Sequence, residues 1–132
     1  MCLLERVLEW DATRVRCAAV SHRHPDNPLR AHGRLGAACG IEYAAQAMAV
    51  HGALCATGGD AQPVARGMLT SMRGVTMEVD RLDDIAQELI VEARRVADAP
   101  NAIAYEFEVT TGDVAAGGRV LLAGRAMITL QR

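Results

Sequence analysis

One acidic residue near the beginning of an uncharged stretch is the clearest candidate for chemistry in this chain. Residues 40–56 read GIEYAAQAMAVHGALCA, which predicts a helix with Glu42 in its first turn. Gln46 follows four residues later and therefore shares a helix face with Glu42. Burial would raise the pKa of this carboxyl group and suit it to acid–base chemistry. The alternative is that Glu42 only stabilises the helix dipole.

Histidines gather in the segment that precedes the expected helix. Residues 22–36 read HRHPDNPLRAHGRLG, in which two prolines and two glycines predict an irregular loop. Three of the four histidines, His22, His24 and His32, lie in this segment, which makes it a candidate wall of a functional site. Loops carry function more often than strands do, although each histidine could instead be an ordinary solvated side chain.

Length and composition exclude several classes of function. At 132 residues the chain is expected to be a single domain, residues 1–132. Its formal charge of -2 and 3% aromatic content argue against nucleic acid as a partner, and its four cysteines form no C-x-x-C pair for zinc. We expect neither a metal nor a cofactor. No apolar run reaches the roughly 20 residues that cross a bilayer. Glu5 and Arg6 interrupt the short apolar start, so we expect a cytoplasmic protein without signal peptide or membrane insertion.

The remaining segments predict an α+β domain, in which an antiparallel sheet surrounds one long central helix at about residues 40–56. Strand candidates occupy residues 3–10, 14–21, 65–79 with a bulge near Gly74, 88–96, 103–109 and 119–130. A helix that is apolar on all sides must be covered by the sheet on one side and by something else on the other. In so small a domain the second cover is expected to be another copy of the chain, which predicts a homodimer or higher homo-oligomer.

Three segments resemble one enzyme family. GIEYAAQAMA at residues 40–49 is similar to the central helix of the hotdog-fold β-hydroxyacyl-(acyl carrier protein) dehydratases, where an acidic residue is followed four positions later by Gln among small apolar residues. The opening LLERVLEW resembles that family's first strand, and GRVLLAGRAMITL at residues 118–130 resembles its last. The resemblance is to the short predicted dehydratases of lipid and polyene gene clusters. It implies the hotdog fold, a curled antiparallel sheet wrapped around the helix.

The same resemblance implies a reaction and residues that carry it out. Such a dehydratase eliminates water from a 3-hydroxyacyl thioester of acyl carrier protein or coenzyme A, with a histidine of one subunit as the base and an acid of the other. Glu42 would be the acid, and Gln46 a supporting residue that forms hydrogen bonds nearby. Backbone N–H groups at the helix start, at Gly40, would hold the thioester oxygen as it gains charge.

The identity of the base and the exact activity stay open at this point. The family's loop reads H-x-x-G-x-P-x-x-P-G, and this chain departs from it. His22 and His24 are favoured because they leave enough loop to reach a neighbouring subunit's helix, and His32 is third. Two alternatives use the same fold: a thioesterase in which Glu42 activates water or attacks the thioester, and a non-catalytic acyl-binding partner subunit.

Overall fold

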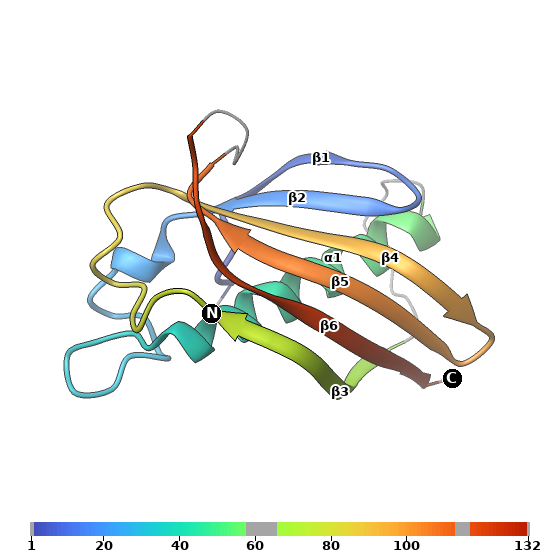
Figure 1. The fold of residues 1–132 in the computed structure, drawn as a ribbon. Coiled ribbons are helices and arrows are strands. Elements are labelled where there is room, and N and C mark those ends of the chain that lie inside the picture. The colour runs from blue at the N-terminus through green and yellow to red at the C-terminus, as the bar shows by residue number, and fades with distance from the viewer. Residues whose placement is uncertain (1, 58–65, 113–116, 132) are drawn as a thin grey trace.

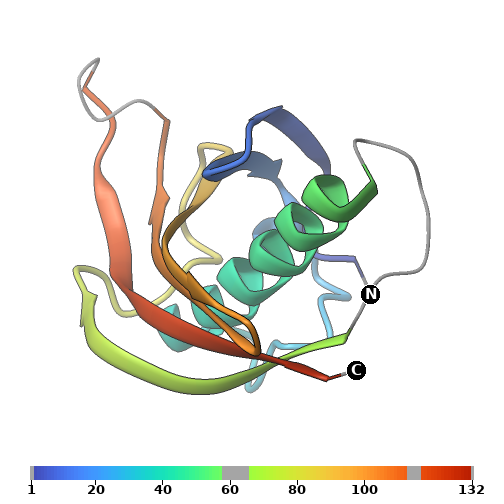
Figure 2. The ribbon, with the colours of Figure 1, turned by 90° about the vertical axis from the view of Figure 1, so that its right-hand side faces the viewer.

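A curved antiparallel sheet wraps around one long helix (Figures 1 and 2). A computed structural model of the chain describes residues 2–57, 66–112 and 117–131. The elements in chain order are β1 (Arg6–Trp10), β2 (Arg14–Ala19), the 3-10 turns η1 (Ser21–Arg23) and η2 (Ala37–Cys39), α1 (Gly40–Thr57), β3 (Arg66–Met77), β4 (Leu89–Ala99), β5 (Ala102–Thr110) and β6 (Val120–Gln131). The strands form one six-stranded sheet in the order β1-β2-β4-β5-β6-β3. The predicted α+β arrangement is confirmed.

Helix α1 lies along the concave face of the sheet (Figure 2), and one stripe of its side chains is buried. The stripe repeats with helical spacing and consists of Tyr43, Ala44, Ala47, Met48 and His51. On the opposite face Glu42 and Ala49 are exposed, so this chain alone does not bury the helix on all sides. The predicted helix at 40–56 is confirmed, whereas the glycines expected to end it lie outside the described residues. No helix among the described residues, α1 included, is long and apolar enough to span a membrane.

The later strands follow the alternation that the sequence predicts. In β5 the side chains of Tyr105, Phe107 and Val109 are buried, which places them on the face toward α1. In β3 the pairing with β6 shifts register between Arg73 and Thr76. Gly74, at φ 57, supplies the left-handed conformation that this bulge requires, as the sequence predicts.

The first two strands are shorter than predicted. β1 begins at Arg6 because Leu3 is buried, and the Leu3 N–H donates a hydrogen bond to Gln46 of α1. β2 ends at Ala19; of the two residues expected to finish it, Val20 precedes η1 and Ser21 is the first residue of η1.

Close packing between the start of α1 and β6 explains Gly40. A Cβ atom at this position would lie 2.4 Å from Cδ2 of Leu122, much closer than two carbon atoms can approach. Leu122 is fully buried and has little room to move aside. The missing side chain therefore lets the first turn of α1, which carries Glu42, lie directly against the sheet.

An ionic cluster ties the loop before α1 to the segment between β3 and β4. Asp83 accepts hydrogen bonds from the Arg81 guanidinium and, at 2.9 Å, from the Leu35 N–H, and Arg30 lies 4.0 Å away. The Arg81 guanidinium holds the pKa of Asp83 well below its usual range, and the Leu35 N–H adds to this effect. The Asp83 side chain is only 7% exposed, so the cluster fixes one end of the histidine-bearing loop.

We expect Asp83→Asn to lower the free energy of unfolding by about 1–3 kcal/mol, because hydrogen bonds to a charged group are lost. Since the folded-state pKa of Asp83 is depressed, its stabilisation is present above the unfolded-state pKa of about 4 and is lost as the pH falls from there. Urea unfolding of both proteins at about pH 7 and about pH 3 measures this. The difference in unfolding free energy between the wild-type protein and Asp83→Asn should be smaller at about pH 3 than at about pH 7. An equal difference at both pH values would contradict the ionic explanation.

Candidate active site

His22 lies in η1 and its side chain is fully buried. Its Nε2 is 3.0 Å from the carbonyl oxygen of Ile85, so Nε2 carries the proton and donates it. The free lone pair is then on Nδ1, which is buried without a hydrogen-bond partner among the described residues. Burial lowers the pKa of His22; the carbonyl groups of Ile85 and Gln87 oppose this effect, and Arg23 and Arg30 add to it. A neutral imidazole with a free lone pair is the form that a general base needs.

The other two loop histidines are exposed and arranged differently. Nδ1 of His24 accepts a hydrogen bond from the Asp26 N–H at 3.1 Å, so a neutral His24 ring carries its proton on Nε2. That form offers a donor to the solvent instead of a base. His32 lies in a turn at φ 55. Hydrogen bonding therefore favours His22 over His24 as the base, although His24 is the more accessible of the two.

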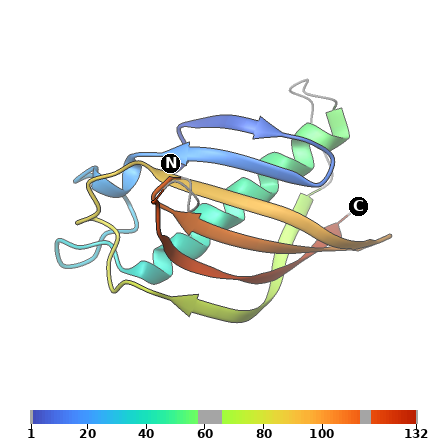
Figure 3. The same cartoon turned by 45° about the horizontal axis from the view of Figure 1, so that its top comes forward.

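His22 and His24 line the same surface hollow, beside the segment that leads into β4. The other lining residues are Val20, Arg23, Pro25, Ala86, Gln87 and Glu88. The structure thus brings two predicted catalytic residues together. Glu42 is not among the residues that line this hollow, although η1 and the beginning of α1 lie toward the same end of the molecule (Figures 1 and 3).

Glu42 occupies the first turn of α1, on the face that the sheet leaves uncovered. One turn earlier, burial raises the pKa of the Cys39 thiol, and the charge of Glu42 adds to that increase. Gly40 is placed at the helix start as predicted, but its N–H donates to the carbonyl groups of Ala37 and Ala38. An exposed carboxyl group at this position is accessible to a molecule outside this chain.

Gln46 and three residues that the sequence did not single out form the contacts behind Glu42. Gln46 Oε1 accepts a hydrogen bond from the N-terminal segment, at the Leu3 N–H. The Tyr43 hydroxyl lies 2.7 Å from Ser21 Oγ and 3.1 Å from Asn27 Nδ2. One signal was available: Tyr43 is a large side chain in an otherwise small-residue helix, and the hydroxyl group of a buried tyrosine needs a hydrogen-bond partner.

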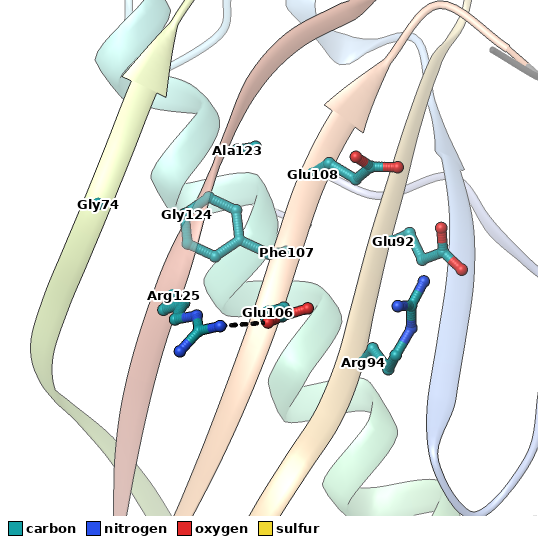
Figure 4. A pocket seen from close by; sticks show the side chains of 9 residues that line it. All are labelled: Gly74, Glu92, Arg94, Glu106, Phe107, Glu108, Ala123, Gly124 and Arg125. Carbon is teal, nitrogen blue, oxygen red and sulfur yellow. Dashed lines mark hydrogen bonds and ion pairs between the residues drawn. The ribbon is translucent and has the colours of Figure 1, made fainter.

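A second hollow lies on the outer face of the sheet and has a different character (Figure 4). It is lined by Gly74, Phe107, Ala123 and Gly124 and by charged side chains, including Arg125, which donates to Glu106 at 2.9 Å. Among its lining residues there is no histidine. Within the described residues no cluster of His, Cys, Asp or Glu could hold a metal ion. We therefore place the candidate site at η1 and the first turn of α1.

Comparison with protein families adds the deciding observation. The model of the ApeP-like family, described as ApeP dehydratase, matches residues 1–128. The chain belongs to this family. The predicted enzyme class, a dehydratase that acts as a hydro-lyase, is confirmed, and so is the resemblance to the hotdog-fold dehydratases. A comparison with curated proteins gives no match.

Solved structures share the fold of this ApeP-like dehydratase. The dehydratase heterocomplex ApeI:P from Xenorhabdus doucetiae is similar with a TM-score of 0.77 and 22% identity, over 98% of this chain and 83% of that chain. A thioesterase from Haemophilus influenzae has a TM-score of 0.67 and 8% identity, over 96% of this chain and 78% of that chain. Zebra fish thioesterase superfamily member 2 has a TM-score of 0.66 and 15% identity, over 96% and 80%. These likenesses confirm the predicted hotdog fold.

Proposed function

We propose that this chain eliminates water from a 3-hydroxyacyl thioester, with His22 as the base and Glu42 as the acid. One observation carries the assignment. In a chain of a dehydratase family, η1 holds an imidazole with a free Nδ1 lone pair, and the first turn of α1 holds an exposed carboxyl group. His24 is the alternative base, because it lines the same hollow.

The reaction needs one group that accepts a proton and one that donates it. His22 Nδ1 would take the proton from the carbon next to the thioester carbonyl, and the electron pair left behind forms the carbon–carbon double bond. Protonated Glu42 would give its proton to the departing hydroxyl group, which leaves as water. A carboxyl group enclosed beside a substrate and away from water favours its protonated form. Proton transfer from the imidazolium to the carboxylate, through solvent, then restores both groups.

The thioester oxygen gains negative charge as the proton leaves. Backbone N–H groups at the start of α1 would stabilise this charge, with Gly40 as the proposed donor. For this the Gly40 N–H would have to exchange its present acceptors, the carbonyl groups of Ala37 and Ala38, for the substrate oxygen.

The base and the acid would meet between two chains. Glu42 lies outside the hollow that His22 lines, and β3 is an edge strand that pairs only with β6 in this sheet (Figure 3). An open edge strand readily pairs with another chain. We infer a partner with the same fold, most simply a second copy related by a two-fold axis. The likeness to the ApeI:P heterocomplex makes a different dehydratase chain the other candidate.

Turnover of defined thioesters tests the proposal. We propose acyl carrier protein as the carrier and the cytoplasm as the location, with coenzyme A as the alternative carrier. Purified protein should hydrate crotonyl-acyl carrier protein, the reverse of dehydration, which is followed by loss of the conjugated double bond. Release of free thiol would instead indicate a thioesterase, and acyl binding without turnover would indicate a non-catalytic subunit. Either result contradicts the proposal.

A further inference from the structure

A continuous series of hydrogen bonds connects the beginning of α1 to η1. Asn27 Nδ2 donates to the Tyr43 hydroxyl at 3.1 Å. Ser21 Oγ lies 2.7 Å from that hydroxyl and donates to the Leu3 carbonyl at 2.7 Å. Because the one hydroxyl proton of Ser21 goes to Leu3, the Tyr43 hydroxyl is the donor to Ser21 Oγ. The Leu3 N–H donates in turn to Gln46 Oε1 at 2.7 Å, which brings the series back to α1.

The Asn27–Tyr43 contact is buried, and the contacts of Ser21 and Gln46 are partly buried. Tyr43 is fully buried, and Leu3 and Asn27 are each only 4% exposed. Water cannot readily replace a lost partner at such positions, so removal of one group leaves another buried and unpaired. Hydrogen bonds that run in one direction through a buried site also strengthen one another. The series is therefore a rigid connection between α1 and η1.

We propose that Tyr43 and Gln46 are positioning residues, which hold the turn that carries His22 firmly against the helix that carries Glu42. Ser21 directly precedes His22, and its carbonyl oxygen is held as well, by Asn27 Nδ2 at 2.9 Å. Tyr43 directly follows Glu42. The clamp, defined as Leu3, Ser21, Asn27, Tyr43 and Gln46, thus joins the neighbour of the base to the neighbour of the acid. This inference rests on the roles proposed above for His22 and Glu42.

The clamp acts on the backbone of η1, while a separate contact acts on the imidazole ring. The Ile85 carbonyl oxygen accepts from Nε2 and sets the tautomer. The clamp fixes the position of the His22 backbone, from which the imidazole side chain extends. Together the two contacts direct the Nδ1 lone pair, and a small displacement of such a group lowers turnover strongly. A loosened clamp should therefore affect kcat more than KM.

Tyr43→Phe removes one hydroxyl group and keeps the ring. Its matched control is Tyr105→Phe. This change removes a buried hydroxyl group of β5 that lies 2.8 Å from Nδ1 of His51, a residue of α1 outside the clamp. The first readout is nitrogen-15 NMR of the His22 ring during a pH titration. The second is hydrogen exchange of the His24 N–H, which is bonded to the Ser21 carbonyl at 3.0 Å. Neither readout depends on enzymatic activity.

In Tyr43→Phe we expect the His22 titration to move upward as water reaches the ring, and the His24 N–H to exchange about tenfold faster. We expect kcat to fall by up to about 100-fold with little change in KM. Tyr105→Phe should change none of these quantities. An unchanged His22 titration and His24 exchange in Tyr43→Phe would overturn the inference, because the hydroxyl group would then contribute to general stability alone.

Gln46 gives a second test that does not depend on how well Tyr43→Phe folds. Gln46→Met removes the acceptor for the Leu3 N–H, whereas Gln46→Glu keeps an oxygen there. Gln46→Met should reproduce the faster hydrogen exchange of the His24 N–H, and Gln46→Glu should keep the wild-type exchange rate. Identical exchange in the two variants would contradict the clamp. If the clamp variants alter His22 but the wild-type chain turns over no hydroxyacyl thioester, the proposed function is wrong and the clamp is not.

Discussion

Replacement of Glu42 by Gln is expected to abolish dehydration and leave the fold intact. The amide has nearly the same shape but no acidic proton, and loss of a general acid typically costs about 10²–10⁴-fold in rate. Glu42 is exposed in the single chain, so the change breaks no buried contact of this chain. Steady-state hydration of a crotonyl thioester and thermal unfolding measure the two effects separately.

The matched control for Glu42 is Glu106→Gln. Glu106 lies on the outer face of the sheet and is paired with Arg125, so the same chemical change there should leave turnover unaltered (Figure 4). Full activity in Glu42→Gln would remove Glu42 from the reaction.

His22→Gln is expected to be about as damaging to activity. The glutamine amide can still donate to the Ile85 carbonyl, but it cannot accept a proton at neutral pH, so the rate should fall by about 10²–10⁴-fold. The control is His24→Gln, at an exposed position in the same hollow. If His24→Gln is the inactive variant and His22→Gln is active, the base is His24.

The pH dependence of the wild-type enzyme provides an independent check on the base. His22 must be neutral to accept a proton, and its pKa is lowered from the ordinary value of 6.5 by burial. The acid limb of kcat/KM should therefore lie below pH 6.5, with activity lost as the pH falls through the folded-state pKa. This limb should disappear in His22→Gln. An acid limb at higher pH would contradict a buried His22 as the base.

The central helix and most strands could be predicted because their signals are local. Helix-forming residues without charge over 40–56 define α1, and alternating apolar side chains define β5. Gly74 marks a bulge because few other residues adopt its backbone conformation. The reaction class could be predicted as well, because an acidic residue followed four positions later by Gln, here Glu42 and Gln46, resembles the central helix of the hotdog-fold dehydratases.

The exposure of Glu42 could not be predicted in the same way. Residues 40–56 are small and apolar on every side of the helix, so the sequence does not show which side the sheet covers. That choice depends on where Tyr43 and His51 find hydrogen-bond partners, and those partners lie in η1 and β5. The sheet of this chain leaves the helix face that carries Glu42 exposed.

The burial of His22 was equally invisible in the sequence. Locally the segment around His22 resembles a solvated loop, with prolines and polar residues on both sides. Its ring is nevertheless held by Ile85, 63 residues away along the chain. Only the folded arrangement shows that Nδ1 of His22 is buried without a hydrogen-bond partner among the described residues, whereas Nδ1 of His24 accepts from the Asp26 N–H.

The activity of a mixed dimer tests most directly whether His22 of one chain and Glu42 of another form a single site. The His22→Gln and Glu42→Gln chains are produced together with different affinity tags, and the dimer that carries both tags is isolated. One of its two sites keeps both groups, so we predict roughly half of the wild-type activity per dimer, while each variant alone is inactive. A mixed dimer as inactive as its parents would contradict a site shared between two copies of this chain.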